Sequence, residues 1–468
     1  MLFNSIDFII FFPVVFVLYW YLAKTVRQRN AIILFSSYVF YGWWDWRFLF
    51  LIATSSLIDF LVGKAIGNSE NLRVRKRLLY TSLAVNLGAL LFFKYCNFFI
   101  DNFIEAFSFF GHKANFRQLN IILPVGISFY TFQTLSYTID IYRKKIKATD
   151  DFLSFFAFVS FFPQLVAGPI ERASNLLPQF YEEKRFAVKK FSTGLKFLIL
   201  GFFLKLVIAD RAAVYVNAVY NNVENHDGYT LIMATLLFSF QIYGDFAGYS
   251  LIAIGTAKFF DFDLMTNFRR PYFSASISEF WTRWHISLST WFRDYLYIPL
   301  GGNRTTKSRW LFNIFITFLI SGFWHGANWT FIIWGALNGG YIVLEKYIFK
   351  KRRTGILNIM LTFVLINISW VFFRANSVQD AYMILQKVVS TPGSLYIGMG
   401  DDIAALIYSL IAILMLMVME VKKEFFNHLF SFSNNRYEFV RLSFFAFLIF
   451  MILYLGVFDE SQFIYFQF

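Results

Sequence analysis

Cysteine and charged residues are both scarce in this chain. Cys96 is the only cysteine among 468 residues, which excludes a disulfide within the chain and a metal cluster held by thiolates. Charged residues make up 15% of the sequence, whereas soluble domains carry about 25%. Because 58% of the residues are hydrophobic and apolar stretches approach the roughly 20 residues that cross a bilayer, the sequence predicts an all-α polytopic integral membrane protein.

The N-terminus lacks a basic lead-in and a small-residue cleavage site, so we expect a first membrane span there and not a removed signal peptide. The formal net charge is +14, but the Lys and Arg residues lie in short loops between apolar stretches, as the positive-inside bias predicts. We therefore expect the chain to lie in the lipid bilayer and not to bind nucleic acid. Cys96, within LLFFKYCNFFI, is predicted to be a packing residue.

Apolar stretches recur from one end of the chain to the other, and we expect a single polytopic domain over residues 1–468 with about eleven to twelve spans. The basic loops 24–29, 73–77 and 143–147 should lie on the cytoplasmic side. The predicted spans are residues 6–23, 31–44, 48–66, 78–99, 121–141, 190–212, 229–255, 310–324, 328–348, 355–373, 403–421 and 440–458.

Residues 152–170, FLSFFAFVSFFPQLVAGPI, are apolar enough to cross the membrane, but basic loops flank both ends. If this segment crossed, every later basic loop would fall outside. Pro163, Gly168 and Pro169 would also break a helix there. We therefore predict a re-entrant or interfacial segment that is shielded by protein, with both ends of the chain outside.

Residues 258–310 are too polar to span and too aromatic to form a solvated loop. We expect them at the cytoplasmic face as amphipathic or re-entrant helices, mainly over 270–300. His285 lies there, in RWHISLSTWFRDYLY, and a helix would put Ser289 one turn away from it. The simpler alternative is an interfacial helix whose histidine is hydrogen-bonded to the backbone.

His325 follows a predicted span that begins near Trp310. A helix from Trp310 to His325 rises roughly 24 Å. We therefore expect His325 deep in the membrane, where an ionisable side chain usually marks a pathway or a reaction site. Histidine also titrates near neutral pH, which suits proton transfer. Gly322 and Gly326 bracket His325 and would allow another chain or a substrate to approach closely. The alternative is a buried histidine that satisfies a helix break.

Several long motifs follow one another along the chain. They are LPVGISFYTFQTLSYTIDIYR (123–143), FFPQLVAGPIER (161–172), FQIYGDFAGYSLIAIGTAKFF (240–260), NFRRPYFSASISEFWTRWHISLSTWFRDYLYIPLGGNR (267–304), SGFWHGANWTFIIWGALNG (321–339) and FIYFQF (463–468). Together they resemble the membrane-bound O-acyltransferase (MBOAT) family, and within it the bacterial branch of alginate and peptidoglycan O-acetyltransferases. This resemblance implies a funnel-like helical core with a transmembrane tunnel and re-entrant segments.

The resemblance also implies roles for individual residues. His325 matches the buried catalytic histidine and would act as general base, and His285 would position the thioester or stabilise the oxyanion. Arg283 and Arg293 would meet the phosphates of coenzyme A, or else reach towards lipid headgroups. Tyr465 would accept the acetyl group near His325, or else serve as an interfacial aromatic anchor.

The expected activity is acetyl transfer at the bacterial inner membrane, from acetyl-CoA in the cytoplasm to an exported polysaccharide of the alginate or peptidoglycan type. An extracytoplasmic acetyltransferase would be the partner, and no metal or permanently bound cofactor is expected. Two alternatives stay open, namely D-alanyl transfer to teichoic acid from a carrier protein and proton-coupled transport. Asp245 is expected to have a structural role at a helix break formed by Gly244 and Gly248.

Overall fold

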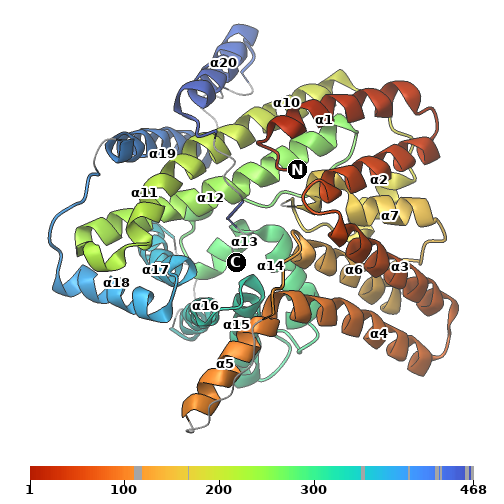
Figure 1. Cartoon of the computed structure of the whole chain (residues 1–468), viewed down its shortest axis with the longest axis horizontal. Helices are drawn as coiled ribbons and strands as arrows, with labels where there is room; N and C mark the ends of the chain where they lie inside the picture. Colours follow the sequence, from red (N-terminus) through yellow and green to blue (C-terminus); the bar gives the residue numbers. More distant parts are fainter. Residues whose placement is uncertain are drawn as a thin grey trace. The chain divides into compact units, whose positions relative to one another are not determined.

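The computed structural model describes residues 1–109, 119–166, 168–348, 354–398, 401–426, 432, 435–458 and 463–464 (Figure 1). Within these residues the ordered elements are helices, and β-strands do not occur, so the prediction of an all-α protein is confirmed. The chain divides into two compact units. Unit 1 comprises Met1–Gly194 and Ala253–Met265, and unit 2 comprises Leu195–Ile252 and Thr266–Phe468. The single domain over 1–468 stays a prediction.

The helices that begin in unit 1 include two π-helical turns, η1 and η2, and one 3-10 turn, η3. In chain order they are α1 (Ile6–Val17), η1 (Leu18–Leu22), α2 (Val26–Gly42), α3 (Arg47–Asn68), α4 (Leu72–Leu90), η2 (Leu91–Tyr95), α5 (Cys96–Phe109), α6 (Ile127–Tyr142), α7 (Phe152–Ser160), α8 (Phe162–Leu165), α9 (Ala173–Leu176), η3 (Leu177–Phe180) and α10 (Val188–Phe202).

The helices that begin in unit 2 include π-helical turns at η4 and η7 and 3-10 turns at η5 and η6. They are η4 (Phe203–Ala209), α11 (Asp210–Tyr220), η5 (Val223–Asn225), α12 (Gly228–Phe259), η6 (Pro271–Phe273), α13 (Ile277–Arg283), α14 (Ile286–Phe292), η7 (Arg293–Tyr297), α15 (Lys307–His325), α16 (Trp329–Ile348), α17 (Ile356–Arg374), α18 (Val378–Ser390), α19 (Asp401–Phe425) and α20 (Glu438–Leu455).

Each predicted span contains a helix, although the boundaries differ. The fifth span was predicted from residue 121, but α6 begins at Ile127, after Pro124 and a left-handed Gly126 (φ 76°). Six helical segments in the described part of the chain are long and apolar enough to cross a membrane. These are Arg47–Asn68, Leu72–Phe109, Gly228–Phe259, Ile356–Arg374, Ile403–Phe425 and Glu438–Leu455.

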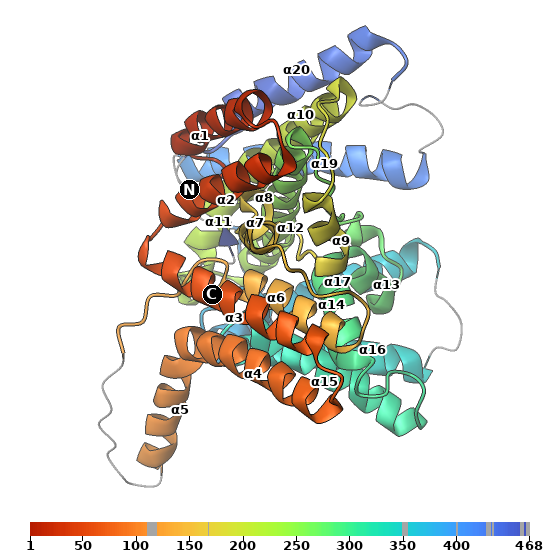
Figure 2. The same ribbon diagram turned by 90° about the vertical axis from the view of Figure 1, so that its right-hand side faces the viewer.

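In unit 1, α3, α4 and α6 pack against one another (Figure 2). A cluster of buried polar side chains lies between them. Asp59 accepts hydrogen bonds from Ser82 Oγ at 2.6 Å and from Asn86 Nδ2 at 2.8 Å. Asn86 in turn accepts from Ser55 Oγ at 2.8 Å. From α6, Thr134 Oγ1 also donates to Asn86 Oδ1 at 3.3 Å. Buried polar groups are costly unless they are hydrogen-bonded, so this cluster fixes how the three helices pack.

Residues 152–170 form the short helices α7 and α8 and not one long helix. A nine-residue helix such as α7 rises only roughly 14 Å, too little to cross a bilayer. The break falls at Phe161 and not at Pro163, which occupies the second position of α8, where its missing N–H costs nothing. Thr149 and Tyr181, before and after the segment, are joined by a hydrogen bond of 2.6 Å. This proximity is what a re-entrant segment requires, and the side on which it returns stays a prediction.

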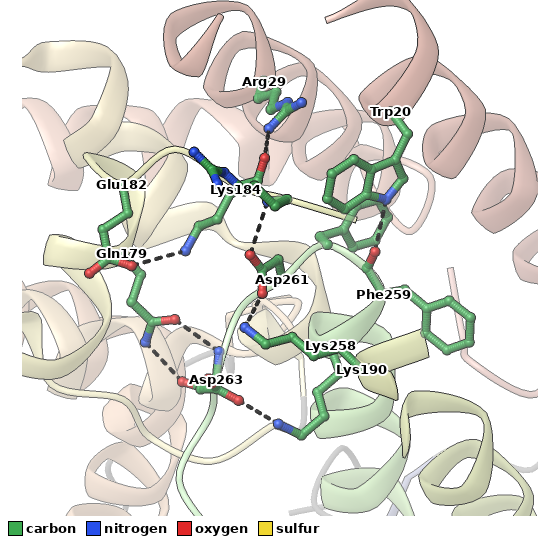
Figure 3. A network of polar contacts seen from close by, with 12 residues as sticks. Trp20, Arg29, Gln179, Glu182, Lys184, Lys190, Lys258, Phe259, Asp261 and Asp263 are labelled. Atoms are coloured by element: carbon green, nitrogen blue, oxygen red, sulfur yellow. Dashed lines mark hydrogen bonds and ion pairs between the residues drawn. The ribbon is translucent and has the colours of Figure 1, made fainter. Parts of the chain in front are cut away.

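A network of polar contacts joins the basic loops of unit 1 (Figure 3). Arg29 donates to the carbonyl oxygen of Lys184. Asp261 accepts from the backbone N–H of Arg185 at 3.2 Å and pairs with Lys190. The start of α2, the loop before α10 and the residues that follow α12 therefore meet in one place, as expected if all of them face the cytoplasm.

In unit 2, α15 and α16 lie side by side (Figure 1). Their contact is close because glycines face one another. A Cβ atom on Gly322 would lie 2.4 Å from the carbonyl oxygen of Phe331, and one on Gly335 would lie 2.5 Å from that of Phe318. Any larger residue at these positions would force the two helices apart.

Candidate active site

The predicted continuous helix through His285 is broken in the structure. Helix α13 ends at Arg283, and α14 begins at Ile286. Between them, His285 adopts a left-handed conformation with φ 43° and ψ 54°. A non-glycine residue in this region costs roughly 1–3 kcal/mol, and such residues cluster at functional sites. The orientation of the His285 ring is thus set by this left-handed turn. The backbone N–H of Ser289 donates to the carbonyl oxygen of His285 at 3.0 Å.

A hydrogen-bond network fixes the ring of His285. Asn267 Oδ1 accepts from the backbone N–H of Ser287 at 3.2 Å and from Ser287 Oγ at 2.9 Å, and Asn267 Nδ2 donates to Ser250 Oγ at 3.2 Å. Since Oδ1 is the acceptor, His285 Nδ1, at 3.1 Å, is the donor. In the neutral ring the lone pair then lies on Nε2.

Burial favours the neutral ring of His285. Only 3% of the residue is exposed. Burial lowers the pKa of His285 well below 6.5, and the neighbouring His325 lowers it further when charged. Sequence reasoning missed Asn267, because a separation of 18 positions from His285 gives no periodic signal that the two meet.

His325 is the last residue of α15, and the chain becomes extended at Gly326 (φ −161°, ψ 155°). The imidazole packs edge-to-face against Trp334, with ring centroids 5.0 Å apart, and against Phe373 at 5.6 Å. A Cβ atom on Gly326 would lie 2.1 Å from the ring of Phe331. The prediction of close approach at the two glycines is therefore met by α16 itself, and not by a substrate or another chain.

Both histidines line one cavity of about 410 Å³, within the range of roughly 300–1,000 Å³ that is typical of ligand sites. Its walls come from α13, α14, η7, α15 and α16. Aromatic rings form part of the wall, and hydroxyl groups and one arginine provide polar contacts. Examples of these lining residues are Trp281, Trp334, Ser289, Ser321 and Arg293.

The two arginines predicted to bind the acyl donor have different surroundings in the structure. Arg293 lines the cavity, and its side chain is 58% exposed beside Asp294. Arg283 is not among the cavity-lining residues, and it pairs with Glu279 at 2.7 Å and Glu424 at 2.8 Å. Two carboxylates already balance its charge, which favours a structural role for Arg283.

Two further sequence predictions concern Tyr465 and metals. Tyr465 lies outside the described residues, whereas its neighbours Phe463 and Ile464 are described and buried. Over the described ranges, no group of three or more His, Cys, Asp or Glu side chains is arranged to hold a metal ion.

The predicted helix break at Asp245 is wrong, because α12 runs unbroken over Gly228–Phe259. The two glycines instead let other helices approach: a Cβ atom on Gly244 would lie 2.9 Å from the carbonyl oxygen of Leu204, and one on Gly248 would lie 2.8 Å from that of Gly201. Asp245 itself forms an ion pair with Lys205 at 2.8 Å.

Comparison with known proteins assigns the family. Residues 16–378 match the family described as MBOAT, membrane-bound O-acyltransferase family. The chain belongs to the membrane-bound O-acyltransferase family. It is therefore an O-acyltransferase, and together with its six long apolar helices in the described part of the chain the match makes it a multi-pass membrane protein.

Three relatives of this O-acyltransferase bear informative names. The chain is 41% identical to the probable alginate O-acetylase AlgI of Pseudomonas aeruginosa over 396 residues, which cover 83% of this chain and 75% of the relative. It is 36% identical to the peptidoglycan O-acetyltransferase of Helicobacter pylori over 429 residues, or 84% and 80% of the two chains. The teichoic acid D-alanyltransferase of Bacillus subtilis is 29% identical over 266 residues, or 52% and 67%.

Proposed function

We propose that this O-acyltransferase moves an acetyl group from acetyl-CoA in the cytoplasm to a hydroxyl of an extracytoplasmic polysaccharide, at the inner membrane of a bacterium. The observation that carries the proposal is that His285 and His325 line one cavity with aromatic walls. The names of the relatives that cover most of the chain support acetyl as the cargo and alginate or peptidoglycan as the type of acceptor.

His325 is proposed as the general base. Its imidazole removes the proton of the acceptor hydroxyl as the oxygen attacks the thioester carbonyl. The tetrahedral intermediate then expels the coenzyme A thiolate, which takes the proton back from the imidazolium. The acyl–sulfur bond breaks, the acyl–oxygen ester bond forms, and the base is regenerated. A base of this kind contributes about 10²–10⁴ in rate.

His285 is proposed to position the reacting groups. With Nδ1–H donated to Asn267, a neutral ring offers Nε2 only as a hydrogen-bond acceptor. This tautomer supports orientation of a hydroxyl and disfavours the alternative role, which is donation to an oxyanion. Arg293 is the stronger of the two candidates for the phosphates of the donor, because its partly exposed guanidinium lies at the cavity wall.

Tyr465 is proposed to accept the acetyl group first and to pass it to an extracytoplasmic acetyltransferase. A phenol with a pKa near 10 needs a base to attack a thioester, and His325 would provide it. The position of the preceding residues supports this role: the ring of Phe463 contacts Phe246 at 5.4 Å, and Phe246 contacts His285 at 4.4 Å.

Release of thiol from acetyl-CoA by the purified protein in nanodiscs, with acetylated polysaccharide or partner as product, tests the proposal. Wild-type protein should release thiol and His325→Ala should not. Passage of substrate across proteoliposomes without thiol release would favour a transporter. Activity only with a D-alanyl carrier protein would favour teichoic acid as acceptor.

The relay through Tyr465 has its own test. Tyr465→Phe keeps the ring and removes the hydroxyl, so acetylation of polysaccharide should be abolished. Tyr454→Phe, on the exposed face of α20, is the matched control and should be normal. Normal acetylation by Tyr465→Phe would make this residue an aromatic anchor.

A further inference from the structure

A buried ionic cluster lies outside the cavity and is not used in the mechanism above. Lys205 Nζ lies between Asp210 Oδ1 at 2.7 Å and Asp245 Oδ1 at 2.8 Å, and all three side chains are at most 5% exposed. Asp245 pairs with Lys205 through Oδ1, and its second oxygen, Oδ2, is also shielded from water. A buried carboxylate oxygen is costly unless a hydrogen-bond donor satisfies it.

The C-terminal segment supplies such a donor. The backbone N–H of Ile464 donates to Asp245 Oδ2 at 2.7 Å, the short distance expected of a hydrogen bond to a charged acceptor. Phe463, the preceding residue, is fully buried and packs its ring on Tyr249 with centroids 4.8 Å apart. The segment is thus held by one charge-assisted bond and by aromatic packing.

The same region holds the chain just before this segment. Arg211 donates to the carbonyl oxygen of Leu455, at the end of α20, at 2.6 and 3.0 Å. The π-helical turn η4 presents the carbonyl oxygen of Leu206, which accepts from the backbone N–H of Val457 at 3.1 Å. Single π-helical turns inside longer helices are frequent at functional sites, and here the turn binds the chain just after α20.

We propose that Lys205 and Asp245 form a tail clamp, which docks the C-terminal segment and sets its position relative to His285. Phe246 provides the link, because its ring contacts both Phe463 and His285. Consecutive Cα atoms are about 3.8 Å apart, so fixing Ile464 limits where the next residue can reach. The value of this positioning for catalysis rests on the proposed function of the tail.

Hydrogen–deuterium exchange of the C-terminal peptide tests the clamp independently of activity. Asp245→Asn leaves one carbonyl oxygen to serve both the Lys205 ammonium and the Ile464 amide. Exchange of the tail should then accelerate about tenfold or more, as expected when a hydrogen bond to a charged group is lost. Asp210→Asn also removes a carboxylate from Lys205 but no contact with Ile464, so tail exchange should stay within about twofold of wild type.

Unchanged tail exchange in Asp245→Asn, or an equal acceleration in Asp210→Asn, would overturn the clamp. If Asp245→Asn fails to fold, a variant that combines Lys205→Met, Asp210→Leu and Asp245→Leu serves in its place, because it removes the three charges of the cluster together. That variant should show the same acceleration of hydrogen exchange in the tail. If its tail exchanged at the wild-type rate, the proposal would likewise be overturned.

Transfer kinetics test whether the clamp positions the tail for catalysis. Asp245→Asn should lower kcat for polysaccharide acetylation about tenfold, more than Asp210→Asn does, and leave KM for acetyl-CoA unchanged because the cavity keeps its residues. Equal losses of kcat in both variants would refute the positioning role. Normal transfer by Tyr465→Phe would remove the relay alone, since the exchange experiment still decides whether the clamp exists.

Discussion

The Asp59 cluster of unit 1 and the two cavity histidines of unit 2 are buried polar groups with different surroundings. In unit 1, Asp59 is fully buried and its oxygens are bonded to Ser82 and Asn86. In unit 2, His285 and His325 are also buried, but both line a cavity. A polar group enclosed by protein partners holds helices together, whereas one that borders a cavity is accessible to a substrate. Burial alone therefore does not separate structural from chemical roles.

Replacement of His325 should have the largest effect on activity. His325→Ala removes the proposed base and should lower acetyl transfer about 10²–10⁴-fold, and the protein should still insert and fold. Rates are measured with labelled acetyl-CoA, and size-exclusion profiles check folding. His226→Ala is the matched control, because His226 is not among the cavity-lining residues. Near-normal transfer by His325→Ala would remove the base from the mechanism.

Replacement of Asn267 should have a smaller effect on the same reaction. Asn267→Ala removes the acceptor of His285 Nδ1 and frees the ring to change tautomer, so transfer should fall about tenfold. The pH–rate profile should change in shape as well as height, which a purely structural defect would not produce. An unchanged profile would show that the orientation of His285 does not depend on this bond.

Disruption of the polar cluster of unit 1 should affect stability and not chemistry. Asp59→Ala leaves Ser82 and Asn86 without their carboxylate acceptor, which should cost about 1–3 kcal/mol of unfolding free energy. Thermal unfolding in detergent measures the loss, and Asp59→Asn should recover part of it. Transfer per folded molecule should match wild type. A selective loss of transfer would instead give the Asp59 cluster a part in the reaction.

The last experiment tests on which side of the membrane the basic loops lie, and both loops should behave alike. In a Cys96→Ser background, single cysteines in 143–147 and in 184–190 should both resist an impermeant thiol reagent applied from outside. The contacts among unit 1 loops in Figure 3 and the bond between Thr149 and Tyr181 fit this expectation. Outside labelling of only one loop would mean that residues 152–170 cross the membrane.

Much of the helical layout could be predicted, because apolar length and basic loops act locally along the sequence. The two histidines and Arg293 could also be selected from their motifs, and the structure brings them to one cavity. The pairing of Arg283 with Glu424 could not, since the partners are 141 residues apart. The left-handed turn at His285 could not be predicted either, because the helical spacing of the apolar residues continues through it.

That left-handed turn restricts which residues position 285 tolerates. β-Branched side chains are strongly disfavoured at positive φ, whereas glycine and asparagine adopt it readily. A library of variants sorted only for folded protein should therefore enrich Gly and Asn at this position. The same library sorted for acetyl transfer should return His. The two selections diverge here because the backbone prefers one residue and the reaction needs another.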